Sequence, residues 1–159
     1  MGQDMEYKRQ LIKRYRADVE PLFRYISWLD TKKGAKVSTS YKDNDLAVHS
    51  MSFPVYDGTL LGFVKDVQKT QLLDRNYLYL YARYQLPTPK AEIELINSVT
   101  LLNMEVLTSI LSKYIMGGMT KGWMWSQAVE EGIFLAILLK FKELIDMWDQ
   151  PATEVGGLE

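Results

Sequence analysis

The strongest constraint on the fold of this chain is the stretch Ile133–Leu139, which consists of seven consecutive apolar residues. Apolar residues continue at helical spacing on both sides of it, at Trp125, Val129, Phe141, Leu144 and Trp148. The pattern predicts a last helix that begins near Trp123. A helix that is apolar on every side lies either at the centre of a core or in an interface with a second subunit. Seven residues fall far short of the roughly 20 that a membrane-spanning helix needs, so we expect no membrane association.

The first part of the chain predicts two helices separated by Pro21. Apolar residues recur there in steps of three and four, at Tyr7, Leu11, Tyr15, Val19, Leu22, Ile26 and Leu29. These steps mark one face of an amphipathic helix. Proline removes a backbone donor and biases the residue before it away from helical geometry. We therefore expect helices over about 5–18 and 21–30, with Pro21 at the first position of the second.

Two helices are predicted in the middle of the chain. Asp57 is a candidate cap for a helix that carries apolar residues on one side, at Leu60, Phe63, Val64 and Val67. The segment Tyr77–Tyr84 alternates like a strand but also carries a helical stripe. Tyrosine favours strands, whereas the neighbouring segments are helical, and we predict a helix on that ground.

A longer helix starts at Thr88 and Pro89, a hydroxyl cap followed by a residue whose missing N–H costs nothing at that position. It is predicted to run to about Met116, where Gly117-Gly118 stops it by adopting left-handed backbone. The expected fold is therefore mainly α, a single compact domain of five to six helices over residues 1–150.

An irregular insert and a tail complete the predicted organisation. The segments Val37–Tyr41 and Leu46–Met51 alternate weakly with period two, so the insert near 37–51 is either a short hairpin or a loop. Residues 151–159 show no periodicity and are expected to form a disordered tail. We interpret its last two residues, Leu158-Glu159, as left by an expression vector.

The composition excludes several kinds of chemistry. The chain of 159 residues has no cysteine, which excludes disulfides, thiolate catalysis and cysteine-ligated metals. Its single histidine, His49, excludes any metal site with two histidines. The net charge of −1 gives no overall electrostatic attraction to nucleic acid or to an anionic membrane. With no secretory signal visible at the start, we expect a cytoplasmic protein.

Only one cluster has the chemistry of a metal site. Asp43, Asp45 and His49 place two carboxylates and an imidazole within seven residues, a ligand set that can hold a divalent ion. A solvated polar turn beside a histidine is the commoner outcome for such a segment.

The adjacent carboxylates of Glu130 and Glu131 point about 100° apart around a helix, too divergent to act on one bond. We therefore assign no catalytic residue and expect no cofactor.

The N-terminal region is basic, whereas the rest is acidic. Residues 1–42 contain ten basic and five acidic side chains, which leaves nine basic and fifteen acidic ones in residues 43–159. The candidate nucleic-acid contacts are Lys8, Arg9, Lys13, Arg14 and Arg16, interleaved with Tyr7 and Tyr15. Because both tyrosines belong to the apolar stripe, an ordinary solvated face explains the basic residues equally well.

The segment between the last two predicted helices has two unusual features. Gly117–Gly122 is rich in glycine and leads into a helix, as anion-binding loops do, but it lacks the order of residues found in a phosphate-binding loop. Trp123-Met124-Trp125 follows at the helix start and can line a groove for an apolar ligand or a partner helix. The alternative is that one tryptophan anchors the corner between helices while the other is partly exposed.

Several segments together resemble an uncharacterised family of small bacterial proteins, a domain of unknown function. The similar segments are Phe53–Tyr56, Leu73–Tyr77, Tyr114-Ile115, Gly122–Trp125, Ala128–Ile133 and Leu138–Leu144. The resemblance covers roughly residues 20 to 148 and implies a bacterial, cytosolic and mainly helical domain. Charged residues are common in the family before the Gly122-Trp123 equivalent, whereas this chain has Gly117–Thr120 there. The resemblance supplies no catalytic residues.

Three functions follow as hypotheses. The first is a non-enzymatic helical interaction module that self-associates as a homodimer through its C-terminal helices. Its candidate contact residues are Trp123, Met124, Trp125, Phe141 and Trp148. The second is a nucleic-acid-associated accessory protein that uses the N-terminal basic face. The third is a small-ligand-binding protein or enzyme with a pocket near Trp123.

Overall fold

A computed structural model describes residues 2–35, 38–40 and 54–149 of the chain. Within these residues the fold is mainly helical, as predicted, with eight α-helices, one 3-10 helix and one pair of short strands. More helices are present than the five to six expected, because three predicted helices are each divided in two. No helix in the described part of the chain is long and apolar enough to cross a membrane.

The N-terminal segment forms a bent rod of α1 (Gly2–Val19), the 3-10 helix η1 (Glu20–Tyr25) and α2 (Ile26–Lys32). The predicted break at Pro21 is confirmed, since this proline lies in the first turn of η1.

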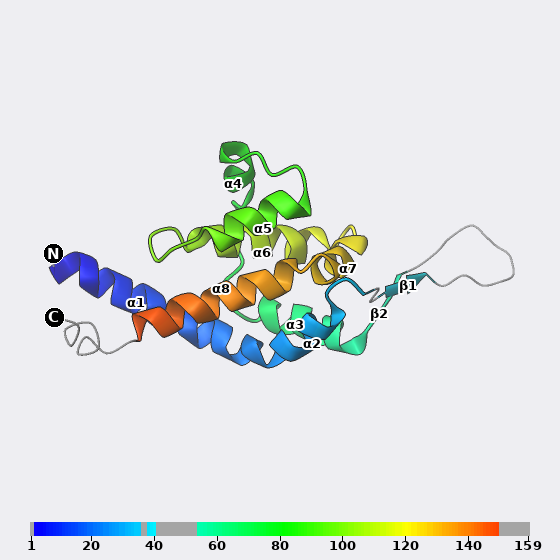
Figure 1. Cartoon of the computed structure of the whole chain (residues 1–159), viewed down its shortest axis with the longest axis horizontal. Helices are drawn as coiled ribbons and strands as arrows, with labels where there is room; N and C mark the ends of the chain where they lie inside the picture. Colours follow the sequence, from blue (N-terminus) through cyan, green and yellow to red (C-terminus); the bar gives the residue numbers. More distant parts are fainter. Residues whose placement is uncertain (1, 36–37, 41–53, 150–159) are drawn as a thin grey trace, which may run out of the picture.

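The apolar stripe on α1 is only partly as predicted. Tyr7 is 65% exposed, and Ile12 takes the buried position in the second half of the helix. Figure 1 shows the reason, because the first turns of α1 extend past the end of α8, beyond the other helices of the described residues.

The insert contains a short antiparallel pair, β1 (Ser38–Ser40) and β2 (Pro54–Tyr56). The first predicted strand is therefore present, but its partner lies at 54–56 and not at Leu46–Met51, which falls outside the described residues. The register joins Thr39 to Val55. A proline is tolerated at the first position of such a strand, where its missing N–H disrupts little of the ladder.

Helix α3 (Gly58–Gln68) begins at its predicted cap, because the Asp57 carboxylate accepts a hydrogen bond from the Thr59 backbone N–H at 2.7 Å. The four apolar residues predicted to face inward are all buried, namely Leu60, Phe63, Val64 and Val67. The cap and the apolar spacing together explain why this helix was predictable from local sequence.

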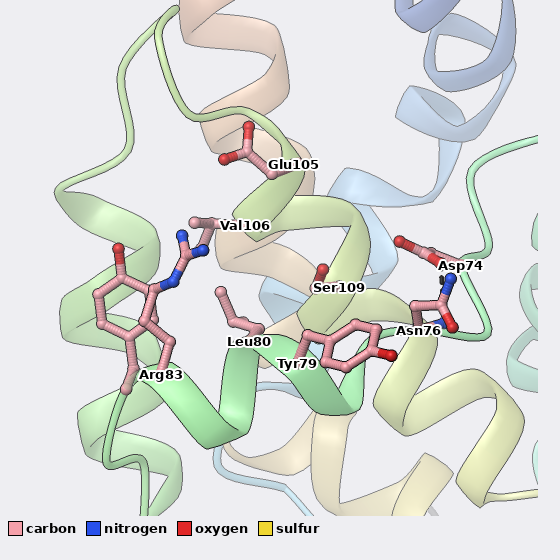
Figure 2. A pocket seen from close by; sticks show the side chains of 9 residues that line it. Asp74, Asn76, Tyr79, Leu80, Arg83, Glu105, Val106 and Ser109 are labelled. Carbon is pink, nitrogen blue, oxygen red and sulfur yellow. Dashed lines mark hydrogen bonds between the residues drawn. The ribbon is translucent and has the colours of Figure 1, made fainter.

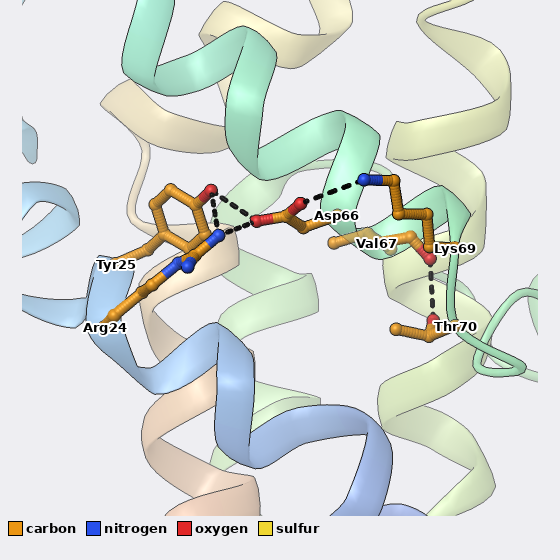
Figure 3. A network of polar contacts seen from close by, with 6 residues as sticks. All are labelled: Arg24, Tyr25, Asp66, Val67, Lys69 and Thr70. Carbon is orange, nitrogen blue, oxygen red and sulfur yellow. Dashed lines mark hydrogen bonds and ion pairs between the residues drawn. The ribbon is translucent and has the colours of Figure 1, made fainter.

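An ionic contact joins α3 to η1. Asp66 accepts a hydrogen bond from the Tyr25 hydroxyl at 2.6 Å and forms ion pairs with Arg24 and Lys69 (Figure 3). We call these four residues the Asp66 network. The Tyr25 ring also packs edge-on against Phe63, with 5.2 Å between ring centroids. Tyr25 thus connects the Asp66 network at the surface to the aromatic packing of the core.

The ambiguous tyrosine-rich segment is helical, as predicted, and forms α4 (Leu78–Arg83). Thr88 then caps α5 (Pro89–Asn97), with its hydroxyl accepting from the Ala91 N–H at 3.2 Å. The cap at Thr88 is a local signal that the tertiary structure does not override, whereas the local pattern of α4 alone is compatible with a strand as well.

The predicted helix over 88–116 is divided by a turn, and α6 (Glu105–Gly117) begins after it. The Asn103 side chain accepts from the Thr100 N–H at 2.8 Å, and the Thr100 hydroxyl accepts from the Leu102 N–H at 3.1 Å. Short polar side chains compete in this way with helical backbone hydrogen bonds.

The predicted last helix is also divided, into α7 (Trp123–Glu130) and α8 (Ile133–Trp148). Gly132 lies between them with a φ of +80°, a conformation that glycine adopts without the steric cost of a side chain. The expectation of left-handed backbone at Gly117-Gly118 is wrong, since Gly118 has a φ of −70°.

Helix α8 occupies the middle of the molecule, with α1 and α2 on one side and α5 and α6 on the other (Figure 1). Within Ile133–Leu139, Leu139 is 45% exposed, whereas Ala136 is half-buried and the other five residues are buried. The central position explains why this stretch is apolar on every side. Phe141, one of the predicted contact residues, is likewise fully buried in this core.

Candidate functional site

The predicted metal cluster cannot be placed, because Asp43, Asp45 and His49 lie outside the described residues. Among the residues that the structure does describe, no group of three or more histidine, aspartate or glutamate side chains is arranged to hold a metal ion. The metal hypothesis stays a prediction for the insert alone.

The glycine-rich segment serves the packing of Trp125. The indole Nε1 donates to the Ile115 carbonyl at 3.1 Å, and the ring lies directly over Gly118. A Cβ atom at Gly118 would lie 2.1 Å from Nε1, and one at Gly117 would lie 2.7 Å from the Met124 sulfur. The two glycines therefore allow close approach of α7 to the end of α6.

The other predicted contact residues are divided between core and surface. Met124 and Phe141 are buried and Trp148 is half-buried, which leaves them little or no surface for a partner. Trp123 is 57% exposed. At this corner Trp125 anchors the two helices and Trp123 is exposed, which is the arrangement predicted as the alternative to a groove.

The N-terminal basic face is partly engaged within the chain. Arg9 pairs with Glu6 at 2.8 Å, and Arg16 pairs with Asp149 at the far end of α8. Lys13 and Arg14 remain exposed. Part of the N-terminal positive charge is therefore paired with the acidic remainder, where Arg16 joins α1 to the end of α8. Nucleic-acid binding stays a prediction.

A pocket of about 180 Å³ lies between α4 and α6, away from the predicted tryptophan site. Figure 2 shows Arg83 and Glu105 toward one end and Asp74 and Asn76 toward the other, with Ser109 between them. The remaining lining residues are Tyr79, Leu80, Tyr84 and Val106. We call this the α4–α6 pocket.

Buried hydrogen bonds fix the loop wall of the pocket. The backbone N–H of Asp74 donates to the Ser112 hydroxyl at 2.7 Å, and this hydroxyl donates in turn to the Thr108 carbonyl at 2.6 Å. The Asp74 carboxylate also accepts from the Asn76 backbone N–H at 2.8 Å. Ser112 is fully buried, so the loop before α4 is held against α6 from within.

A buried carboxylate fixes the helical wall. Glu92 on α5 is fully buried, and its Oε2 accepts from the Tyr81 hydroxyl at 2.6 Å and from Lys113 Nζ at 2.7 Å. Its Oε1 accepts from the Tyr114 hydroxyl at 2.5 Å. We call these four residues the Glu92 centre. It joins α4, α5 and α6, and therefore sets the position of the helix that carries Arg83.

The chemistry of the Glu92 centre is that of a structural contact. Burial, and then the hydrogen bond to Glu92, raise the pKa of Tyr81 and of Tyr114 far above the ordinary value of 10.0. Both hydroxyls thus stay protonated and keep donating. The Lys113 ammonium lies 4.7 Å from the centre of the Tyr81 ring, which adds a cation–π contact. Since both oxygens of Glu92 are occupied, we regard it as a positioning residue.

Sequence reasoning missed this site, although one signal for it was present. Glu92 lies four residues before Ile96 and seven before Val99, on the same apolar stripe of the predicted helix. A carboxylate on such a stripe indicates a buried polar partner. No comparable signal marked Arg83 or Glu105, which have the spacing of ordinary solvent-facing residues.

No family model matches the chain, and neither a curated protein nor a solved structure is significantly similar to it. The resemblance to a bacterial family stays a prediction.

Proposed function

We propose that this chain is a non-enzymatic helical binding protein and that its α4–α6 pocket binds a small polar molecule. One observation supports this proposal above the others. Arg83 and Glu105 both line the pocket from solvent-exposed positions, and neither side chain forms an ion pair or hydrogen bond with any other residue in the described part of the chain. Charged groups of opposite sign that converge on a hollow without neutralising each other are suited to a ligand.

The surroundings of these two residues support the same proposal. The Asp74 backbone is held by the buried Ser112, and α4 is held by the Glu92 centre, so the backbone that carries the lining residues is fixed before any ligand arrives. A preformed site loses less conformational entropy on binding than a flexible one. The pocket is smaller than the roughly 300–1,000 Å³ that drug-sized ligands occupy, which favours a metabolite of few atoms.

Thermal denaturation in the presence of a library of small polar molecules tests the proposal. A ligand at 100 times its Kd is expected to raise the free energy of unfolding by about 2.7 kcal/mol. Arg83→Met should remove this increase, whereas Lys90→Met, an exposed change on α5, should keep it. If no molecule stabilises the wild-type chain, or if both variants respond like wild type, the pocket is not the binding site.

Self-association is a second candidate function, and it has its own observation. Trp123 is 57% exposed and Met119, four residues earlier, is 62% exposed, so two large apolar side chains lie at the α6–α7 corner. Tryptophan is enriched among residues that dominate protein interfaces. We propose this corner as the contact between two copies of the chain. The apolar face of α8 is not available for that contact because it is buried within the chain.

Light scattering at about 50 mM and about 500 mM NaCl tests the second candidate, because salt screens charges but not apolar contacts. A dimer is expected at both salt concentrations, and Trp123→Ala should convert it to a monomer. Leu102→Ala is the matched control, since Leu102 is 79% exposed in the turn between α5 and α6. A wild-type monomer at both concentrations would remove self-association and leave the pocket proposal unaffected.

A further inference from the structure

The charges of the α4–α6 pocket are unequal in number and separated in space. Its lining contains one basic residue, Arg83, and two acidic residues, Asp74 and Glu105. Figure 2 shows Arg83 and Glu105 toward the same end, while Asp74 lies at the opposite end beside Asn76. A complementary ligand therefore carries one anionic group, a cationic group close to it, and a second cationic group farther away.

This distribution leads to a class of ligand, on the basis of the function proposed above. We infer that the α4–α6 pocket binds a small diamino acid, with its carboxylate on Arg83, its α-ammonium on Glu105 and its second ammonium on Asp74. Arginine presents a planar set of donors that fits a carboxylate. The apolar side chains of Leu80 and Val106, which also line the pocket, suit the aliphatic chain between the two ammonium groups.

Other ligand classes fit the pocket less well. A phosphate or nucleotide would meet two carboxylates for a single arginine, so like-charge repulsion opposes it. A divalent cation would be repelled by Arg83, which lies near Glu105. A plain diamine would leave the guanidinium of Arg83 without an anion. The volume of about 180 Å³ also suits a molecule of amino-acid size.

Isothermal titration calorimetry on the full chain tests the inference with three matched ligands. L-Lysine carries all three groups, L-norleucine lacks the second ammonium, and 1,5-diaminopentane lacks the carboxylate. We expect L-lysine to bind at least about tenfold more tightly than either analogue. A difference of about tenfold in Kd is what the loss of one charge-assisted contact should give. Equal affinities for L-lysine and 1,5-diaminopentane would overturn the inference, because the carboxylate would then go unrecognised.

Two variants assign the contacts to residues. Arg83→Met should abolish the preference for L-lysine over 1,5-diaminopentane. Asp74→Asn should abolish the preference over L-norleucine, while its side-chain oxygen can still accept the bond from the Asn76 N–H. Lys90→Met is the control and should preserve both preferences. A variant that loses the wrong preference, or a control that loses either, would contradict the proposed orientation.

The outcomes separate this inference from the proposed function. If the molecule that stabilises the chain in the wider library carries no ammonium or no carboxylate, and its effect depends on Arg83, the pocket stands and the ligand class is wrong. If no polar molecule binds, both proposals fail.

Discussion

Two carboxylates in this chain have the same kinds of partner but lie in different surroundings. In the Glu92 centre and in the Asp66 network, a carboxylate accepts from a tyrosine hydroxyl and pairs with a cation. The Glu92 side chain is 1% exposed and its partner Lys113 is 29% exposed, whereas Asp66 is 24% exposed and its partner Arg24 is 65% exposed. Water screens the exposed pair and can replace its hydrogen bonds, but it cannot do so in the core. We therefore expect burial, more than the set of partners, to decide how much such a contact stabilises the fold.

Replacing Glu92 by alanine should give the largest effect. The variant leaves the Tyr81 and Tyr114 hydroxyls and the Lys113 ammonium, whose side chain is 29% exposed, without their acceptor. A buried polar group left without a partner costs about 1–3 kcal/mol of unfolding free energy, so the loss of several contacts at once should exceed that of any other single change proposed here. Urea denaturation measures the loss. Glu94→Ala, at an exposed position on the same helix, should change stability by less than about 0.5 kcal/mol. A loss below about 1 kcal/mol for Glu92→Ala would contradict the role given to burial.

Removing single tyrosine hydroxyls separates the contributions of the two Glu92 oxygens. Tyr114→Phe leaves Oε1 of Glu92 without its donor, and a buried acceptor without a partner costs about 1–3 kcal/mol. Tyr81→Phe leaves Oε2 bonded to Lys113, so its cost should be smaller. The same denaturation experiment gives both values. Equal losses of unfolding free energy, or a larger loss for Tyr81→Phe, would show that the two Glu92 oxygens do not depend on separate donors.

The exposed counterpart should be much less sensitive. Asp66→Asn removes the charge that pairs with Arg24 and Lys69, and exposed ion pairs contribute about 0.2–1 kcal/mol. The free energy of unfolding should therefore fall by less than about 1 kcal/mol. The difference between wild type and variant should shrink further in about 500 mM NaCl because the salt screens the pair. A loss as large as that of Glu92→Ala would contradict the role given to burial.

Acid should reveal the smallest effect. The hydrogen bond from Tyr25, supported by Arg24, lowers the pKa of Asp66 below its ordinary value of 3.8 although partial burial opposes this. The unfolded chain therefore binds more protons between the two pKa values, and the stabilisation is present above pH 3.8 and lost as the pH falls through the folded pKa. The stability difference between wild type and Asp66→Asn should be largest near neutral pH and smaller near pH 2. A difference that is independent of pH would contradict the assignment.

The sequence predicted the elements that short-range chemistry decides. The cap at Asp57, the cap at Thr88 and the break at Pro21 were found because each acts on neighbouring backbone groups. The division of α5 from α6 was missed, although Thr100 and Asn103 are residues whose side chains compete with helical hydrogen bonds. The apolar spacing on both sides of that turn outweighed this weaker signal.

The mainly helical fold could be predicted from the amino-acid sequence, because helical periodicity is set by residues three and four positions apart. The sequence also indicated that Ile133–Leu139 must be covered, but it took the packing of the helices to show that the chain covers most of this stretch itself. The α4–α6 pocket was decided by packing alone. Its charged residues are far apart in sequence, and their meeting depends on Glu92 and Ser112, whose partners lie on other elements. Local patterns carry no record of such contacts, since burial and pairing arise only when the helices pack together.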